Sequence, residues 1–537
     1  MADEWSREER AALAPYFTNL DGPVFALVNL PEVVKGALFA RYSRSPKSLR
    51  RLFLDEFLGP GGLEAAARDP AHAGAGAGRA EQLFERVFVE YGDDSVAQLG
   101  GVHLACEGAS NILTKVLEWG RLMAYLEQST RYVPYDDRPG GRYRYHVPAE
   151  LRGGLRERYV ATLDRWFDAY RAWLPKMRAF YEAKFPRDPA ESESVYRLTI
   201  RAKALDTLRG MLPAATTSNV GIYGTGQAYE QLLLRMRAHP LREVRDYADL
   251  MLVELRKVIP AFLKRVDVPE RGGAWSTYLE DTRRETRDVA RRLLGSESVS
   301  AGRAELSAAD EVTLTDYDPD GEAKVVAAAL YAVSNRSDAE LNAIARRMTA
   351  DERSAVLAAY VGKRLNRRHR PGRAFERTAY RFDVLGDYGA FRDLQRHRLL
   401  TLEWQRLTPR HGYALPEAVA DAGAADDWRS VLAQSAELHD AIEAAGAADA
   451  AAYAVSMAYR VRFYMEMNAR EAMHVIELRT APQGHPAYRR ICQAMHRLIG
   501  ERHPAIAAAM TFADHSAVEL ERLEAERAAE RRRAGSA

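Results

Sequence analysis

The sequence predicts an α+β protein made of two related halves, each combining strands with helices. Two segments, VFALVNLPEVVKGALFARYSRS from Val24 and VTLTDYDPDGEAKVVAAALYAVSNRS from Val312, each read as a short strand, a proline turn and an alanine-rich helix. Further along, GGVHLACEG and TAYRFDVLG, which end at Gly108 and Gly386, alternate as half-buried strands do. Because the landmarks recur in the same order, we interpret the chain as an internal duplication.

A second pair of landmarks lies near the end of each half. The segments LLLRMRAHPLREVRDYADLM and IELRTAPQGHPAYRRICQAM share a Leu-Arg, a His-Pro pair and a closing amphipathic helix. Between the halves, residues 268–309 contain RGGAWS and GSESVSAGRAELS and read as a linker with one charged helix inside. We therefore predict a first domain at 1–267 and a second at 310–537 that ends in a charged tail.

Composition indicates a folded, cytoplasmic protein. The chain has 537 residues, of which 47% are hydrophobic and 28% charged, so wholesale disorder is excluded. No apolar run reaches about 18 residues, which argues against membrane insertion and export. Cys106 and Cys492 are the two cysteines, so neither a disulfide framework nor a cysteine metal site is indicated.

Arginine clusters in KRLNRRHRPGR at 363–373, although the formal net charge of the whole chain is only +2. The planar guanidinium group suits phosphate and carboxylate groups. A solvated helix face or a nucleic-acid patch is an equally good interpretation of the charge alone. RNA binding would predict an affinity that depends steeply on salt, and we consider nucleic acid an unlikely partner because the cluster directly precedes a strand of the second half.

Two groups of ionisable residues in the second half can carry chemistry. Residues 395–398, QRHR, fall on a predicted helix, where three consecutive cationic side chains cannot share one face. This cluster can grip a diphosphate or form salt bridges with acids elsewhere. Downstream, Asn468 opens a helix on which Arg470 and His474 share a face at i, i+4 spacing, with Arg479 just beyond its end. Such residues on a helix are more often structural when they stand alone.

In the first half, the stretch EQSTRY at 127–132 places Ser129 and Arg131 on one side of a short extended segment. A hydroxyl and a guanidinium presented together, with backbone N–H groups nearby, make a phosphate cradle. A six-residue match of this kind is weak by itself.

Taken together, these motifs resemble the flavin-dependent thymidylate synthases (ThyX). The family signature is an Arg-His-Arg triplet, a spacer, then Asn-Glu-x-Ser-x-Arg-Tyr, with Asn-x-Arg and Leu-Arg on a later helix. Neither half has every motif, and the specificity of the resemblance comes from their shared order. It implies two ThyX-like domains, each a small mixed or antiparallel sheet with long helices.

The second half resembles the flavin-binding part of such a protein. Arg479 matches the Leu-Arg arginine near the pyrimidine, which we take as catalytic. The nucleotide loop is altered, because Thr408 and Arg410 follow a longer spacer than in the family motif. Gln405-Arg406 replace its Asn-Glu pair. Ala452 replaces the arginine of the Arg-x-x-Leu-Pro segment. The positions that match FAD contacts are Arg396, His397, Arg398, Asn468, Arg470 and His474.

The first half resembles the nucleotide-binding part. Its flavin motifs have decayed, since the triplet reads Trp119-Gly120-Arg121 and Asn-x-Arg reads Gly224-Thr225-Gly226. Arg235 matches the Leu-Arg arginine, the second candidate catalytic residue. The positions that match contacts to the dUMP phosphate are Glu127, Ser129, Arg131 and, in RGMLP, Arg209.

This complementary pattern of loss suggests that the first half supplies the nucleotide loop and the second the flavin grip. Because active sites of the family are shared between subunits of a homotetramer, two chains would form a four-domain pseudo-tetramer. The resemblance implies reduction of FAD by NADPH, methylene transfer from methylenetetrahydrofolate to C5 of dUMP, and hydride delivery from the flavin. Arginines would orient the pyrimidine and stabilise negative charge.

One family motif, His-x-Ser-x-x-Glu-His, has lost its histidines. It reads DDSVAQL at 93–99 and PGRAFE at 371–376, so that Ser95 and Glu376 survive. This departure puts folate handling in question and leaves three functions open. The protein is a thymidylate synthase, an enzyme that modifies another uridine nucleotide, or a non-catalytic flavin- or nucleotide-binding paralogue.

Overall fold

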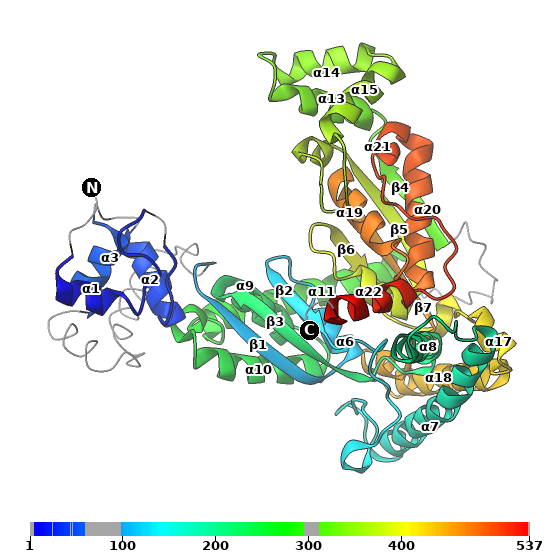
Figure 1. Cartoon of the computed structure of the whole chain (residues 1–537). Helices are drawn as coiled ribbons and strands as arrows, with labels where there is room; N and C mark the ends of the chain where they lie inside the picture. The colour runs from blue at the N-terminus through cyan, green and yellow to red at the C-terminus, as the bar shows by residue number, and fades with distance from the viewer. Residues whose placement is uncertain are drawn as a thin grey trace. The chain divides into compact units, whose positions relative to one another are not determined.

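The computed structural model describes residues 5–23, 25–42, 45, 47–58, 98–294 and 311–534 (Figure 1). The chain forms two compact units, each described by itself. The first unit comprises Met1–Glu107, Gly120–Glu127 and Asn219–Ser296. The second unit comprises Gly108–Trp119, Gln128–Ser218 and Glu297–Ala537. Ser95 and residues 295–309 of the predicted linker lie outside the described residues.

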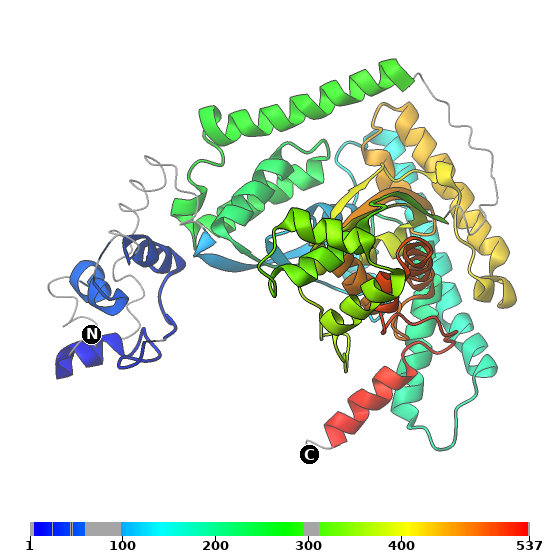
Figure 2. The same ribbon diagram turned by 90° about the horizontal axis from the view of Figure 1, so that it is seen from above.

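The first unit is built around a three-stranded sheet in the order β1-β3-β2. Strand β1 (Gly101–Ser110) ends in the second unit, and β2 (Met123–Glu127) runs antiparallel to β3 (Thr217–Thr225). The helical elements of this unit are α1 (Arg7–Leu13), α2 (Glu32–Tyr42), α3 (Leu49–Leu52), the π-helix η1 (Phe53–Leu58), α9 (Gly226–Arg237), α10 (Arg242–Arg256), η6 (Pro260–Leu263), η7 (Pro269–Gly273) and α11 (Ala274–Leu294). Figure 2 shows α11 as one long helix, and it is the charged helix expected between the halves.

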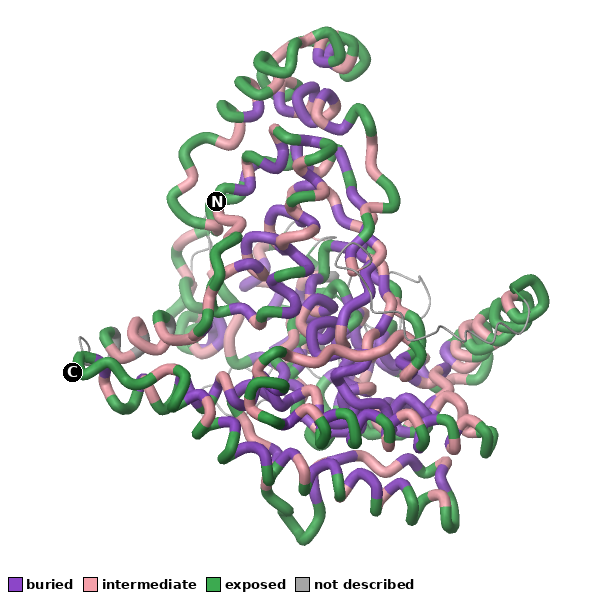
Figure 3. The backbone as a smooth tube through the Cα atoms, turned by 90° about the vertical axis from the view of Figure 1, so that its right-hand side faces the viewer, coloured by how far each residue is buried: buried purple, intermediate pink, exposed green. Residues whose placement is uncertain are grey.

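The second unit is built around a four-stranded antiparallel sheet in the order β4-β5-β7-β6. Its strands are β4 (Val312–Tyr317), β5 (Ala379–Asp387), β6 (Thr401–Trp404) and β7 (Arg460–Asn468). Alternate residues of β7, from Val461 to Met467, are buried, which is the period-2 pattern of a strand with one face on the core. Figure 3 shows buried residues concentrated along strands and the helices packed on them.

The helices of the second unit also come from both halves of the sequence. From the first half come α6 (Asn111–Leu117), η4 (Pro139–Gly141), α7 (Gly153–Lys184), α8 (Glu193–Leu208) and η5 (Arg209–Met211). From the second half come α13 (Gly321–Tyr331), α14 (Asp338–Arg347), α15 (Ala350–Val361), η8 (Arg373–Arg377), α16 (Tyr388–Leu394), η9 (Pro409–His411), α17 (Glu417–Asp421), α18 (Ala425–Ala444), η10 (Ala450–Ala454), α19 (Ala469–Arg479), α20 (Pro486–Arg502), α21 (Pro504–Ala508) and α22 (Leu523–Ala534).

The two halves repeat the same order of elements. The series β1, α6, β2, long helices, β3, α9 and α10 corresponds to β5, α16, β6, long helices, β7, α19 and α20. Within the second unit the halves also meet, because Pro213 and Ser456 form an antiparallel bridge. The amide N–H of Ala214 donates to the carbonyl of Val455 at 2.8 Å, and that of Met457 donates to the carbonyl of Leu212 at 2.9 Å. The predicted α+β class with two similar halves is confirmed.

Four local predictions were wrong. The described residues after Val24 form no strand and make only an isolated bridge between Leu27 and Phe17. The segment 396–398 follows α16 instead of lying on it, because the helix ends at Leu394 before the chain turns into β6. The segment after Glu127 is a turn, in which the N–H groups of Tyr132 and Val133 both donate to the carbonyl of Ser129. Arg479 is the last residue of α19 and does not lie beyond it. None of the described helices is both long and apolar enough to span a membrane.

A buried ion pair holds the arginine-rich segment 363–373 against α19. Arg364 and Glu477 lie 2.6 Å apart with only 2% of either side chain exposed. Arg364 also donates to the carbonyls of His369 and Ala509. Because both charges are desolvated, each depends on the other for its stabilisation.

We expect Glu477→Ala to destabilise the second unit by about 3–5 kcal/mol, because the Arg364 guanidinium would remain buried without its partner. Thermal unfolding followed by circular dichroism would measure the loss. Glu501→Ala is the matched control, since the Arg497–Glu501 pair is exposed and is worth at most about 1 kcal/mol. Equal losses of stability in the two variants would contradict a larger contribution from the buried Arg364–Glu477 pair.

Candidate functional site

The turn after β2 presents Arg131 to the interior of the second unit. Arg131 is 8% exposed, and its Nε lies 2.7 Å from both carboxylate oxygens of Asp206 on α8. Its NH1 also donates to the hydroxyl of Tyr488 and to the carbonyl of Gln483, both at 3.4 Å. The hydroxyl of Ser129 accepts from the N–H of Arg131 at 3.2 Å. A residue of the first half is therefore held by residues of α20 and its preceding loop in the second half.

Arg209 enters the same region from the C-terminal end of α8, where it is the first residue of η5. It is 4% exposed, and its NH1 lies 3.5 Å from Oδ2 of Asp393 on α16. Its buried NH2 has no hydrogen-bond partner among the described residues. Gly389 leaves room for the guanidinium, because a Cβ at that position would lie 3.0 Å from Nε of Arg209. A buried cationic donor without a partner indicates a place for an anionic ligand.

Asp393 collects the positive charges of both halves. Burial alone would raise the pKa of this carboxyl, but Arg396, Arg209, Arg479 and Arg131 together hold it below its usual value. Asp393 is therefore ionised at neutral pH. Other carboxylates also face these guanidinium groups, because Asp206 pairs with Arg131, Asp387 is close enough to interact with Arg209, and Glu118 lies 3.8 Å from Arg396. Carboxylates of the protein therefore offset much of the positive charge of the cluster.

Arg479 connects this cluster to a second group of residues. Its guanidinium lies over the ring of Tyr488, 5.5 Å from the centroid, and its Nε donates to Nε2 of His397 at 2.9 Å. Because Nε2 accepts, the neutral imidazole carries its proton on Nδ1, which faces Glu471 at 3.6 Å. Glu471, His397 and Arg479 thus form a chain that fixes the orientation of the guanidinium.

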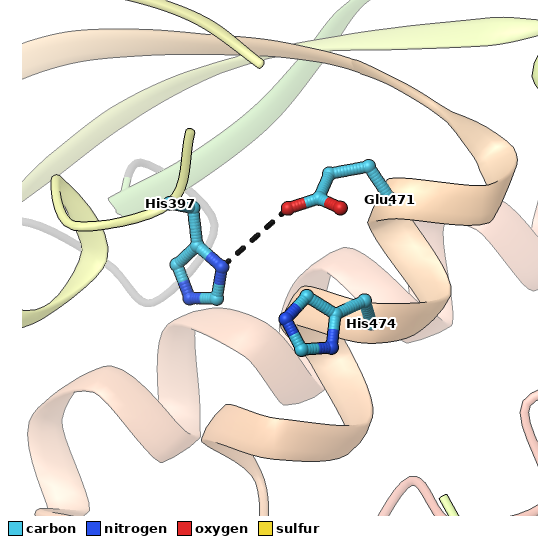
Figure 4. Close-up of side chains that lie close together, drawn as sticks. All are labelled: His397, Glu471 and His474. Carbon is cyan, nitrogen blue, oxygen red and sulfur yellow. Dashed lines mark ion pairs between the residues drawn. The ribbon is translucent and has the colours of Figure 1, made fainter. Parts of the chain in front are cut away.

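His397, Glu471 and His474 converge as shown in Figure 4. One nitrogen or oxygen atom from each lies within 4.8 Å of the others, a separation that a metal ion can bridge. The charge around them is unfavourable to a cation, however, because Arg479 donates to His397 and Arg370 donates to His474 at 3.0 Å. Neutral imidazoles beside guanidinium groups suit an electron-rich or anionic ligand better than a divalent ion.

Burial controls the protonation of this group. It lowers the pKa of His397 well below the ordinary value, with Arg479 and Arg370 acting in the same direction. Burial, reinforced by Arg370, His397 and Arg367, lowers the pKa of His474 to about 4 against the opposing charge of Glu471. Burial also raises the pKa of Glu471. Both imidazoles are consequently neutral at pH 7.

The remaining predicted flavin contacts lie around the same helix start. Asn468 is the N-cap of α19, where its side chain accepts from the N–H of Glu471 at 2.9 Å. Arg470 donates to the carbonyl of Pro371 at 2.9 Å and lies 3.3 Å from Glu376. Arg396 lies 3.8 Å from Glu118, and Arg398 is exposed.

The structure does not bring every predicted site residue together. Glu127, buried at the end of β2, and Arg235, on α9, belong to the first unit. The other ten predicted residues belong to the second unit. The roles of all twelve stay predictions.

The family model described as "Thymidylate synthase complementing protein" (Thy1) matches two segments of the chain, residues 54–261 and 313–505. The chain belongs to the Thy1 family.

Relatives of two kinds support this assignment. A UPF0159 protein of Chlamydia muridarum is 38% identical over 526 residues, which cover 97% of this chain and 98% of the relative. A UPF0159 protein of Thermoplasma acidophilum is 30% identical, with 92% and 97% covered. A flavin-dependent thymidylate synthase of Clostridium tetani is 26% identical over 209 residues, or 38% of this chain and 76% of that protein.

A solved structure, a UMP/dUMP methylase PolB from Streptomyces cacaoi bound with 5-Br dUMP, is similar to part of the chain. The match has 20% identity and a TM-score of 0.30, and it covers 37% of this chain and 93% of the other.

The two Thy1 segments differ at corresponding places. In the second segment, Arg406 and Arg410 of the loop after β6 both pair with Glu443 of α18, Arg410 at 2.5 Å. Ala452 lies in η10, in the place that Arg209 takes at η5. One internal carboxylate is therefore shared by the two guanidinium groups of this loop, and the position that corresponds to Arg209 carries no charge.

Sequence reasoning missed several members of the arginine cluster. Asp393, three residues before Arg396, resembled an ordinary helix acid, and Asp206 resembled another on α8. Tyr488 lies three residues after His485 of the His-Pro pair that marked the repeat. The sequence therefore indicated its position but not its role. Their convergence depends on contacts more than 75 residues apart in sequence, such as Arg131 with Tyr488.

Acid should weaken the second unit through His474. Its pKa is about 4 when folded, against about 6.5 in the unfolded chain, so the unfolded state binds more protons between these values. Stability therefore falls as the pH drops below about 6.5 and levels off below about 4. We expect the decrease in melting temperature from pH 7 to pH 5 to be smaller in His474→Gln. His369→Gln, on the exposed part of the arginine segment, serves as control. If the melting temperature of His474→Gln decreased as much as that of the wild type, His474 would not be the source of the acid sensitivity.

Proposed function

We propose that this protein is an FAD-dependent enzyme of the thymidylate synthase type, which methylates dUMP or a related uridine nucleotide at C5. Methylenetetrahydrofolate and NADPH would be its co-substrates. The observation that carries the proposal is the joining of Arg131 and Arg209, from the first half, to Asp393 and Arg479, from the second. Neither half contains this set by itself.

Arg131 and Arg209 would bind the phosphate of the nucleotide. The NH2 of Arg209, which has no hydrogen-bond partner among the described residues, can donate to a phosphate oxygen. Arg479 would lie at the pyrimidine, where a guanidinium stabilises negative charge that develops on the ring. His397 and Glu471 keep Arg479 in its orientation.

The residues around the start of α19 fit a flavin. Arg396, Arg398, Arg470 and His474 would bind FAD, with Asn468 holding the helix start on which two of them lie. The fit rests on neutral imidazoles and guanidinium groups that together offer donors to an electron-rich ring and a diphosphate. Bound FAD supplies the hydride chemistry that no side chain can supply.

We further propose one working nucleotide site per chain. The loop of the first half belongs to the same cluster as Arg209. The loop of the second half pairs with Glu443, and Ala452 stands at the position that corresponds to Arg209. A homodimer would then form a four-domain pseudo-tetramer with two sites. We also propose a first domain at 1–267, a linker at 268–309 and a second domain at 310–537. Glu127 would contribute to nucleotide binding, and Arg235 would be a catalytic residue.

A non-catalytic flavin- or nucleotide-binding role is the second candidate. It is favoured by the missing histidines of the His-x-Ser-x-x-Glu-His motif. Its surviving Glu376 pairs with Arg373 and Arg470 instead of standing beside a histidine of that motif. A turnover assay on flavin-loaded protein separates the two candidates.

The absorbance spectrum of the purified protein with added FAD and dUMP tests the proposal. We expect bound flavin in the wild type and its loss in Arg470→Ala. Arg209→Ala should keep the flavin but weaken dUMP binding about 10- to 100-fold, because a hydrogen bond between charged groups is worth about 1.5–3 kcal/mol. Wild-type protein that binds no flavin would refute the enzyme.

Calorimetric titration with dUMP tests the number of sites. We expect one nucleotide per chain, with binding lost in Arg131→Ala and retained in Arg410→Ala. The two arginines occupy corresponding loops and are therefore matched controls for each other. Two nucleotides per chain, or equal losses in both variants, would contradict the single site.

A further inference from the structure

A segment beyond the second Thy1 match packs back onto residues of the first half. The match ends at residue 505, and residues 511–534, here called the strap, include α22. Near its start, the N–H of Asp514 donates to the hydroxyl of Thr480, the C-cap of α19, at 2.9 Å. The strap is therefore no part of the matched family segments, yet it is fixed to an element of the candidate site.

Further along, the strap is anchored to the start of α8. Nε of Arg527 lies 2.6 Å from Oε2 of Glu191, which is buried. Glu530 accepts from the hydroxyl of Ser192, the N-cap of α8, at 2.6 Å and from that of Ser194 at 3.0 Å. A carboxylate at the start of a helix is also favoured by the helix dipole. The charged helix α22 is thus attached through residues of both signs.

One strap residue holds α8 close to Asp206, the partner of Arg131. Oε1 of Glu521 lies 2.5 Å from Nζ of Lys203, and the two side chains are 3% and 16% exposed. Lys203 lies on α8, three residues before Asp206. Because both charges are largely removed from water, separating the strap from the helix at this point is costly.

The next strap residue holds the turn that carries Arg131. The guanidinium of Arg522 lies over the ring of Tyr132, 4.1 Å from the centroid, and Tyr132 directly follows Arg131 in the chain. A guanidinium in this position is attracted by the face of the ring. The same turn contains the N–H groups of Tyr132 and Val133, which donate to the carbonyl of Ser129. Arg522 therefore contacts the turn at the residue beside the phosphate arginine.

We propose that the strap clamps the nucleotide turn against α8, with Arg522 as a positioning residue that acts on Arg131 through Tyr132. Glu521 and Arg522 are neighbours in the chain, and they contact the two elements whose side chains form the Arg131–Asp206 pair. The inference rests on the proposed nucleotide site, in which Arg131 binds the phosphate. An arginine that is already held in place loses less conformational freedom when the phosphate binds.

Calorimetric titration of the full chain with dUMP tests the clamp. Arg522→Ala should bind dUMP about 2- to 5-fold more weakly, which is the worth of one cation–π contact, because the turn would leave its binding conformation more often. Arg522→Lys keeps a cation over the ring and should stay within about twofold of the wild type. Arg531→Ala is the matched control, since Arg531 is an exposed arginine of the same helix, and it should bind as the wild type does.

Two further measurements separate positioning from a general loss of structure. Deoxyuridine lacks the phosphate, so Arg522→Ala and the wild type should bind it with equal affinity. Hydrogen exchange at the amides of Tyr132 and Val133 should be faster in Arg522→Ala than in Arg531→Ala, because these amides close the clamped turn.

Three outcomes overturn the inference alone. They are equal dUMP affinities of Arg522→Ala and Arg531→Ala, an equal weakening of dUMP and deoxyuridine binding in Arg522→Ala, and unchanged hydrogen exchange of the turn in that variant. Wild-type protein that binds no dUMP overturns the nucleotide site itself, and the inference with it.

Discussion

Charge compensation among buried arginines is the constraint on which the second unit depends. A guanidinium removed from water must find carboxylates or hydrogen-bond acceptors. Arg131 and Arg209 are buried in this way, and the partly exposed Arg396 and Arg479 also act on Asp393. Asp206 and Asp393 offset part of this charge, and Tyr488 and Gln483 supply neutral acceptors. The helices and turns that carry these residues come from both halves, so the halves must pack together for the charges to be compensated.

This constraint bears on how the two Thy1 segments of the chain can differ at corresponding places. Once both halves contribute to one cluster, the corresponding cluster is free to lose its arginines. In the second half, Arg406 and Arg410 share the carboxylate of Glu443, and Ala452 stands without charge at the position that corresponds to Arg209. An internal carboxylate removes the requirement for a ligand, whereas the unpaired NH2 of Arg209 retains it.

Local patterns predicted the parts of the fold that depend on local physics. The alternation in TAYRFDVLG became β5, and Asn468 became the N-cap of α19, because strand burial and capping are set by neighbours in sequence. The sequence did not predict the end of α16 before Arg396 or the turn at Ser129. Each is set by the tertiary path that the chain follows afterwards and not by its sequence neighbours. The ring of charges around Asp393 was out of reach, because it joins α8, α16, α19 and α20 through tertiary contacts alone.

The hydrogen bond from Arg479 to His397 links the arginine cluster to the group formed by His397, Glu471 and His474. Arg479 faces the arginine cluster, while His397 faces Glu471 and His474 at the start of α19. The bond requires Nε2 to accept, so a proton placed there would convert an attraction into the repulsion of two cations. Burial and the nearby guanidinium groups prevent that protonation at neutral pH by lowering the pKa of His397. Arg479 thus helps to keep neutral the imidazole that orients it.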